Sequence, residues 1–241
     1  MLYMIGLGLW DAQDISLRGL EMVKSCDYIY LENYTSKLDC PLSDLEKLYG
    51  KKVILAEREF VEDGEVILSQ STEKNVALLI IGDVFGATTH ISLFKEAKER
   101  NVKVGIVNNA SVLNAVGVVG LELYKYGKVA SIPFGHSDVK APCDVLKMNL
   151  ANGLHSLFLL DLAPKENKYM ECKEAVSYLI NNGAITADTK VVVCAKLGCK
   201  DYVVKYLEAG SVSELKLYPQ CLIVPGELHF VEEEMLELWS A

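Results

Sequence analysis

The stretch that says most about the fold is Val76-Ala-Leu-Leu-Ile-Ile81, which runs directly into Gly82-Asp-Val-Phe-Gly-Ala-Thr-Thr-His90. Six consecutive apolar residues of this kind are typical of a strand buried on both faces. The polar segment therefore begins at the carboxyl end of a strand, where open α/β sheets bind their ligands. Its glycines permit close approach of a ligand to the backbone, and Asp83, Thr88 and Thr89 offer polar groups. A Gly-Asp turn followed by a capped helix is the alternative interpretation.

Outward from this stretch, apolar strands alternate with amphipathic helices. The first half of the chain contains expected strands at residues 2–8, 28–31, 53–55, 76–82 and 102–107. Strands that alternate with helices predict a mostly parallel sheet covered on both faces. Beyond residue 110 the chain continues with a small-residue helix at 111–123 and then with further strands and helices. We therefore expect two α/β domains, residues 1–110 and 111–241, packed without a flexible linker.

The composition excludes several classes of protein. Of the 241 residues, 51% are apolar, and 24 basic against 33 acidic side chains give a net charge of −9. So acidic a chain repels phosphate backbones, and we expect no direct nucleic-acid partner. The longest apolar runs are only strand-sized, and the segment Met1–Leu9 lacks a basic leader region. Neither a membrane span nor a signal peptide is therefore expected.

The seven cysteines and four histidines indicate the cellular compartment and argue against a metal site. The cysteines are scattered and none forms a C-x-x-C pair, which fits a reducing, cytoplasmic location. His90, His136, His155 and His229 do not combine with them into a zinc-ligand spacing, so no metal is expected. The chain also lacks a G-x-S-x-G elbow and a G-x-x-x-x-G-K-[ST] phosphate loop, which argues against hydrolases and nucleoside triphosphatases.

Two more polar segments follow strands. Gly6-Leu-Gly-Leu-Trp-Asp11 comes after the first strand and Glu32 lies at the end of the second, as in a dinucleotide-binding fold. Asp11 stands where the third glycine of that fingerprint belongs. A nicotinamide-dependent oxidoreductase is therefore kept as the alternative from a different class. Asn108-Asn-Ala-Ser-Val112 follows the last strand of the first half, where Ser111 either caps a helix or faces the same crevice.

These segments and several others lie in an order that resembles one family over nearly the whole chain. The matching segments are Met1–Leu9, Asp14–Glu21, Tyr34-Thr-Ser36, Gly82–His90, Asn109-Ala-Ser111, Gly153-Leu-His155 and Ile223–His229. The combination resembles the diphthine synthases, within the wider family of tetrapyrrole-methylase-like, or class III, methyltransferases. The resemblance implies two α/β domains of the tetrapyrrole methylase type, with S-adenosylmethionine in the cleft between them, and usually a homodimer.

The resemblance also implies an activity. This is the repeated methylation of a 3-amino-3-carboxypropyl histidine on translation elongation factor 2, an intermediate in diphthamide biosynthesis. The family's cofactor contacts fall on Leu9, Asp83, Gly86, Ser111, Val112, Leu160, Leu197 and Gln220. Val84 and Gln220 depart from the family's pattern, because a proline and a histidine are usual there. No residue stands out as a general base, so no catalytic residue is assigned.

Three alternatives and the number of methyl groups stay open on the sequence. Another class III enzyme, acting on a tetrapyrrole or an RNA, is the alternative within the family, and the acidic charge disfavours RNA. An interaction protein that keeps the fold without catalysis is another, beside the oxidoreductase. Three methyl groups on nitrogen give diphthine, and a fourth on the carboxylate gives its methyl ester. Leu31-Glu32 and Phe85-Gly86 resemble eukaryotic members, which favours four.

Overall fold

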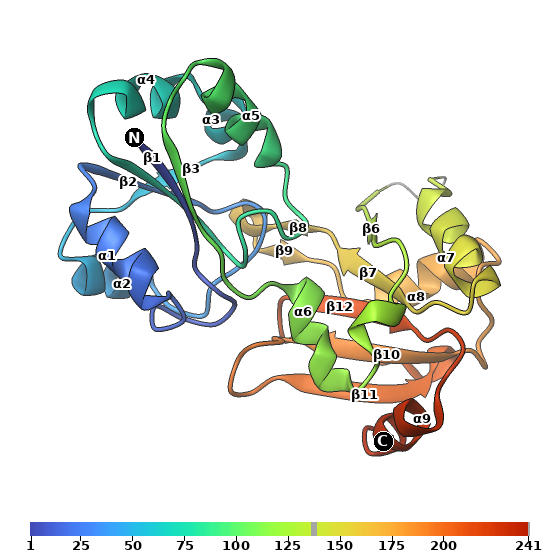
Figure 1. The fold of residues 1–241 in the computed structure, drawn as a ribbon. Coiled ribbons are helices and arrows are strands. Elements are labelled where there is room, and N and C mark those ends of the chain that lie inside the picture. The colour runs from blue at the N-terminus through green and yellow to red at the C-terminus, as the bar shows by residue number, and fades with distance from the viewer. Residues whose placement is uncertain (136–138, 241) are drawn as a thin grey trace. The chain divides into compact units, whose positions relative to one another are not determined.

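The computed structural model describes residues 1–135 and 139–240 and divides into two compact units, Met1–Leu113 and Asn114–Ala241 (Figure 1). Each unit contains a five-stranded sheet with helices, so the expected α/β class is confirmed. The division lies three residues beyond the boundary expected after residue 110, so Ser111 and Val112 belong to the first unit. His136, one of the histidines considered as metal ligands, lies outside the described residues.

The first unit is built on a parallel sheet with the strand order β3-β2-β4-β1-β5. Its strands are β1 (Leu2–Gly6), β2 (Tyr28–Glu32), β3 (Ile54–Ala56), β4 (Val76–Ile80) and β5 (Val104–Val107). β1 and β4 are neighbours, yet the chain leaves β1 toward β2 on one side and leaves β4 toward β5 on the other. The carboxyl ends of two such strands form a topological switch point, which is where α/β sheets hold ligands.

Helices cover both faces of this sheet (Figure 1). Leu2 and Met4 belong to a core that includes α3, α4 and α5, whereas Ile5 and Leu7 belong to the opposite core with α1 and α2. Successive side chains of a strand point to opposite faces, so β1 serves both cores. One of these helices, α3 (Arg58–Asp63), is not predicted from the sequence. The helices are α1 (Leu17–Ser25), α2 (Leu42–Tyr49), α3 (Arg58–Asp63), α4 (Glu65–Glu73) and α5 (Ile91–Glu99).

The second unit contains a mixed sheet with the order β11-β10-β12-β7-β6, in which β6 and β7 are parallel and the other described neighbours antiparallel. α7 and α8 pack on one face through Leu146, Val176 and Leu179. Its elements are β6 (Ala130–Ile132), α7 (Ala141–Ala151), β7 (Ser156–Leu160), β8 (Leu162–Ala163), β9 (Lys168–Tyr169), α8 (Cys172–Asn181), β10 (Lys190–Ala195), β11 (Val203–Glu208) and β12 (Gln220–Val224).

The single helix predicted over residues 111–123 is wrong. α6 (Val112–Ala115) is only four residues long and continues into a 3-10 turn over Val116–Val119. That turn ends at Gly120, whose φ of 95° lies in the left-handed region. Glycine stops a helix there because it adopts this backbone without a side-chain clash.

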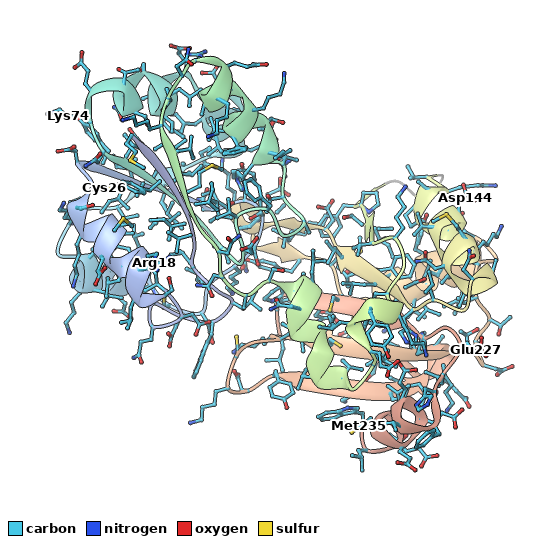
Figure 2. All side chains as sticks on the ribbon, in the orientation of Figure 1. Arg18, Cys26, Lys74, Asp144, Glu227 and Met235 are labelled. Atoms are coloured by element: carbon cyan, nitrogen blue, oxygen red, sulfur yellow. The ribbon has the colours of Figure 1, made fainter. Side chains whose placement is uncertain are left out.

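A buried carboxylate ties the last helix, α9 (Phe230–Glu237), to the rest of the second unit. Glu232 is 1% exposed. It accepts hydrogen bonds from the side chains of His155 and Lys125 and from the backbone N–H groups of Glu122 and His229. Burial alone would raise the pKa of Glu232, but these donors lower it to about 2, so the carboxylate stays ionised. On the same helix, Met235 (Figure 2) lies so close to Gly120 that a side chain at position 120 would collide with it.

We expect Glu232→Gln to lower the free energy of unfolding by about 3 kcal/mol, because it leaves buried donors without their charged acceptor. The contribution of Glu232 is present above its ordinary pKa of 4.5 and is lost as the pH falls from 4.5 toward 2. Urea unfolding at several pH values, followed by circular dichroism, measures both effects. Glu234→Gln, an exposed change on the same helix, is the matched control. Equal stability of the two variants at pH 7 would contradict this role of the clamp, which Glu232 forms with its donors Glu122, Lys125, His155 and His229.

Candidate functional site

Two glycines join the carboxyl ends of β1 and β4 at the switch point. Gly8 donates its N–H to the Gly82 carbonyl at 3.1 Å, and Gly82 donates to the Gly8 carbonyl at 2.7 Å. Both have left-handed backbones, with φ of 80° and 87°, which residues with side chains rarely adopt. A Cβ at position 8 would also lie 2.7 Å from the Cβ of Asp14. The glycine pair therefore sets where Leu9 and Asp83 leave the sheet.

The turn after β1 is closed by a carboxylate. Asp14 Oδ2 accepts hydrogen bonds from the backbone N–H groups of Leu9 at 3.1 Å and Trp10 at 2.8 Å. In a dinucleotide-binding fold, N–H groups at this turn face a pyrophosphate, which a carboxylate in the same place repels. Glu32, the candidate ribose ligand of that interpretation, is completely buried and bonded to the Ile81 backbone. The alternative of a nicotinamide site is therefore wrong.

Asp83 binds the neighbouring loop and stays ionised. Its Oδ2 accepts hydrogen bonds from the Asn108 side-chain amide and the Asn109 backbone N–H, both at 3.0 Å. Its Oδ1 accepts one from the Phe85 N–H at 3.0 Å. Burial would raise the pKa of the Asp83 carboxyl, but the hydrogen bonds from Asn109, Phe85 and Asn108 outweigh burial and lower it. A partly buried carboxylate thus fixes a negative charge beside the ends of β4 and β5.

Asn109 connects this loop to the turn after β1. Its side-chain amide donates to the carbonyls of Gly6 and Asp14, each at 3.0 Å. The sequence indicated only a polar segment here, because the partners of Asn109 lie about a hundred residues away along the chain. The Asn109 side chain thus joins its loop to the turn after β1, and its backbone N–H joins the same loop to Asp83.

Gly86 and Ser111 are in direct contact. A Cβ on Gly86 would lie 2.7 Å from both the Cβ and the Oγ of Ser111. Ser111 is buried, and its hydroxyl oxygen accepts a hydrogen bond from the Leu113 N–H at 3.3 Å, so it caps α6, as one of the two interpretations expected. The candidate cofactor contacts that lie at the carboxyl edge of the first sheet are thus Leu9, Asp83, Gly86, Ser111 and Val112.

The other three candidates lie at one end of the second sheet. Leu160 ends β7, Gln220 begins β12 and Leu197 follows β10, and β12 is antiparallel to both of its neighbours. Gln220 is buried, and its Oε1 accepts a hydrogen bond from the Cys172 N–H at 2.7 Å. Its Nε2 donates to the carbonyls of Leu215 and Leu217. Both amide hydrogens of Gln220 are thus used inside the protein, which leaves no side-chain donor for a ligand.

A buried polar pair lies beneath the segment that carries Asp83. The Tyr34 hydroxyl lies 3.3 Å from His90 Nε2, and His90 is 2% exposed. The Arg58 guanidinium lies over the Tyr34 ring, 4.9 Å from its centre. Burial lowers the pKa of His90, although the Glu32 charge and the Val84 carbonyl act in the opposite direction. A neutral His90 is therefore a fixed hydrogen-bonding partner, which the sequence motif did not indicate.

Residues 1–135 and 139–240 contain no group of three His, Cys, Asp or Glu side chains that is arranged to hold a metal ion. None of the helices described there combines the length and the apolar character needed to cross a membrane.

Comparison with known proteins gives the family. A family model for tetrapyrrole (corrin/porphyrin) methylases matches residues 1–212. The chain is 38% identical to diphthine methyl ester synthase of Mus musculus, over all of this chain and 96% of that one. It is 37% identical to diphthine synthase of Methanocaldococcus jannaschii, over 98% of each chain. A solved structure of a diphthine synthase matches with a TM-score of 0.92 at 34% identity, over 99% of this chain and 95% of that one.

The fold, the strand-end site and these matches together define a methyltransferase that uses S-adenosylmethionine as its methyl donor. The chain belongs to the tetrapyrrole methylase family. Within that family, the relatives that it matches over their full length are diphthine synthases and diphthine methyl ester synthases.

We expect Gly86→Ala to weaken S-adenosylmethionine binding and to lower the free energy of unfolding by about 1–3 kcal/mol, because its Cβ forces Ser111 to move. Isothermal titration calorimetry and urea unfolding measure the two quantities. Gly117→Ala is the control, since a Cβ there meets Leu123 at an ordinary distance of 3.5 Å. A Gly86→Ala variant that binds the cofactor as the parent protein does would show that this contact is dispensable.

Proposed function

We propose that this chain carries out the successive methylations that convert the 3-amino-3-carboxypropyl histidine of translation elongation factor 2 into the methyl ester of diphthine. The observation that supports this most is similarity over essentially the whole chain to relatives named diphthine methyl ester synthase and diphthine synthase. Similarity confined to one unit would support the fold alone. Here it covers every residue considered for the site.

We assign the contacts with S-adenosylmethionine to two sets of residues. The first unit contributes Leu9, Asp83, Gly86, Ser111 and Val112, and the second contributes Leu160, Leu197 and Gln220. Asp83 fits the cofactor's cationic groups because its ionised carboxylate attracts positive charge. The direct contact of Gly86 with Ser111 also fits a cofactor site, because Gly86 has no side chain to separate the two loops that meet there.

Positioning is the main task of these residues. When bound, S-adenosylmethionine supplies an activated methyl group that an amine or carboxylate takes up as the carbon–sulfur bond breaks. Holding the acceptor and the donor in line converts an encounter in solution into a reaction within one complex. The loops that carry Leu9, Asp83 and Ser111 are fixed to one another by the Gly8–Gly82 backbone bonds, the Asp83 carboxylate and the Asn109 side-chain amide, so they suit this task.

We propose four methyl transfers rather than three. The relative from Mus musculus is named for the methyl ester and the one from Methanocaldococcus jannaschii for diphthine, at nearly equal identity. These two relatives alone do not choose between the products, but a relative from Arabidopsis thaliana named probable diphthine methyl ester synthase is 42% identical, which supports the methyl ester. The segments Leu31-Glu32 and Phe85-Gly86, which resemble eukaryotic members, favour the methyl ester.

We also propose that the protein acts in the cytoplasm as a homodimer. The homodimer follows from the family resemblance. The location fits seven free cysteines, most of them buried, which a reducing compartment keeps as thiols.

Asp83→Asn is expected to weaken the binding of S-adenosylmethionine by roughly tenfold or more, because it removes a charge and places an amide against the Asn109 N–H. Isothermal titration calorimetry measures the affinity. Asp27→Asn is the matched control, because Asp27 caps the Asn75 N–H in the same way at the opposite, amino edge of the sheet. Unchanged affinity in Asp83→Asn would remove Asp83 from the cofactor site.

Intact-mass spectrometry of the elongation factor tests the proposed function. The factor carries the aminocarboxypropyl histidine and is incubated with this protein and S-adenosylmethionine. Four successive mass steps of one methyl group each are expected, and a series that stops at three would assign diphthine as the product. If the mass does not change although cofactor binding is confirmed separately, the proposed function is wrong. The chain would then methylate another acceptor, such as a tetrapyrrole or an RNA, or would bind the cofactor without catalysing a reaction.

A further inference from the structure

The segment Glu32–Ser36, which follows β2, contains a carboxylate and a hydroxyl that the proposed cofactor site does not use. Glu32 is completely buried. Its Oε2 accepts hydrogen bonds from the backbone N–H groups of Tyr34 at 3.3 Å and Thr35 at 3.1 Å. Its Oε1 accepts the Ile81 N–H at 3.2 Å and the Thr35 hydroxyl. Four donors therefore satisfy this carboxylate inside the protein.

The bond to Glu32 decides what the Thr35 hydroxyl can do. A hydroxyl has one hydrogen to donate, and Thr35 gives it to Glu32 Oε1. Toward any ligand, Thr35 Oγ1 is therefore an acceptor of hydrogen bonds. Donation to a charged carboxylate also draws electron density toward Oγ1, which makes it a stronger acceptor. The group that such an atom binds best carries an N–H or O–H donor.

The position of this hydroxyl places it beside the proposed cofactor site. Glu32 Oε1 accepts both the Thr35 hydroxyl and the N–H of Ile81, which is two residues before Asp83. The Thr35 hydroxyl and the backbone just after β4 therefore both donate a hydrogen bond to the same carboxylate oxygen. Thr35 is partly exposed whereas Glu32 is not, so a ligand at this edge touches Thr35 and not Glu32.

The loop is held firmly enough to act as a fixed support. Tyr34, between Glu32 and Thr35, contacts His90 through its hydroxyl, and the Arg58 guanidinium covers its ring. Burial raises the pKa of the Tyr34 hydroxyl, so it stays protonated. Thr35 is therefore fixed from one side by Glu32 and from the other by the Tyr34–His90 contact.

We propose that Thr35 Oγ1 binds the amino group of the acceptor and orients its lone pair, with Glu32 as the positioning residue. This inference rests on the proposed function. The acceptor amine has N–H groups to donate, and Thr35 is an acceptor whose own hydrogen is already engaged. In each N-methylation the nitrogen lone pair forms the new N–C bond, and the C–S electrons stay on sulfur. After the first and the second transfer, the resulting ammonium loses one proton to water, whereas the third transfer gives a quaternary ammonium that has no proton to lose.

The number of N–H groups on the acceptor amine falls as methylation proceeds, so the role of Thr35 should differ between the early and the late transfers. A neutral primary or secondary amine has an N–H to donate to Thr35. A neutral tertiary amine, the acceptor in the third transfer, has none. Thr35 therefore assists the first two transfers and not the third, whereas a residue that merely supports the fold affects all transfers alike.

The test is a time course of intact mass for Thr35→Val with the unmethylated factor and with the dimethylated factor. We expect the first two transfers to slow by roughly tenfold, as for the loss of one hydrogen bond, and the third to keep its parent rate. Thr35→Ser, which keeps the hydroxyl, should restore the first two transfers. Affinity for S-adenosylmethionine, measured by calorimetry, should change by less than twofold.

Thr72→Val is the matched control, because Thr72 is exposed on α4 and its hydroxyl donates to the Ser69 carbonyl. It should leave all transfers unchanged. Parent rates in Thr35→Val would overturn the proposal, and so would an equal slowing of the third transfer or a loss of cofactor affinity. A parent protein that fails to methylate the factor would instead overturn the proposed function, and this inference with it.

Discussion

The first unit depends on the two backbone hydrogen bonds between Gly8 and Gly82. They extend the contact of β1 with β4 by one step beyond the regular sheet, at the position where the connections of the two strands diverge. A residue with a side chain in either position would need a backbone that it rarely adopts. Because Leu9 and Asp83 are the next residues, the direction in which both side chains leave the sheet follows from this pair.

Carboxylates that bind the protein's own backbone are the second recurring feature. Asp14, Asp83 and Glu32 each accept N–H groups of loops at the carboxyl edge of the first sheet. Glu232 does the same in the second unit. A buried carboxylate is stable only when its lone pairs are satisfied, so each one fixes several loop segments at once. An acidic composition therefore contributes here to the rigidity of loops as well as to the surface charge.

The sequence predicted the elements whose signal is local. The run Val76–Ile81 and the segment after Met1 were identified as strands because their apolar residues are consecutive, and both lie in the centre of the sheet. The edge strand β11 and the short helix α3 were not predicted. β11 is only partly buried, so its residues show no continuous apolar run, and its pairing with β10 is a contact between segments distant in sequence. Gly120 ended the predicted helix through a backbone angle that composition alone does not specify.

The sequence predicts candidate residues for the site but not the contacts that those residues make. Asp83 and Ser111 are predicted because they follow strands, whereas the contacts of the Asn109 amide with Gly6 and Asp14 form only in the folded chain. The position of Glu32 in the sequence suggests a ribose ligand, which is wrong because the folded chain buries its carboxylate completely. Gln220 differs from the family's usual residue, and its side-chain amide binds groups within the protein, which the sequence does not reveal.

The clamp around Glu232 has a consequence for the synthesis of the chain. Its partners Glu122, Lys125 and His155 precede it by about 77 to 110 residues, so they leave the ribosome long before Glu232 does. Until then, His155 and the Lys125 ammonium lack the carboxylate that compensates their burial. The second unit thus spends the later part of translation with an incomplete core, and a stop codon ahead of α9 would make that state permanent. In a cell, such truncated chains are substrates for chaperones and proteases.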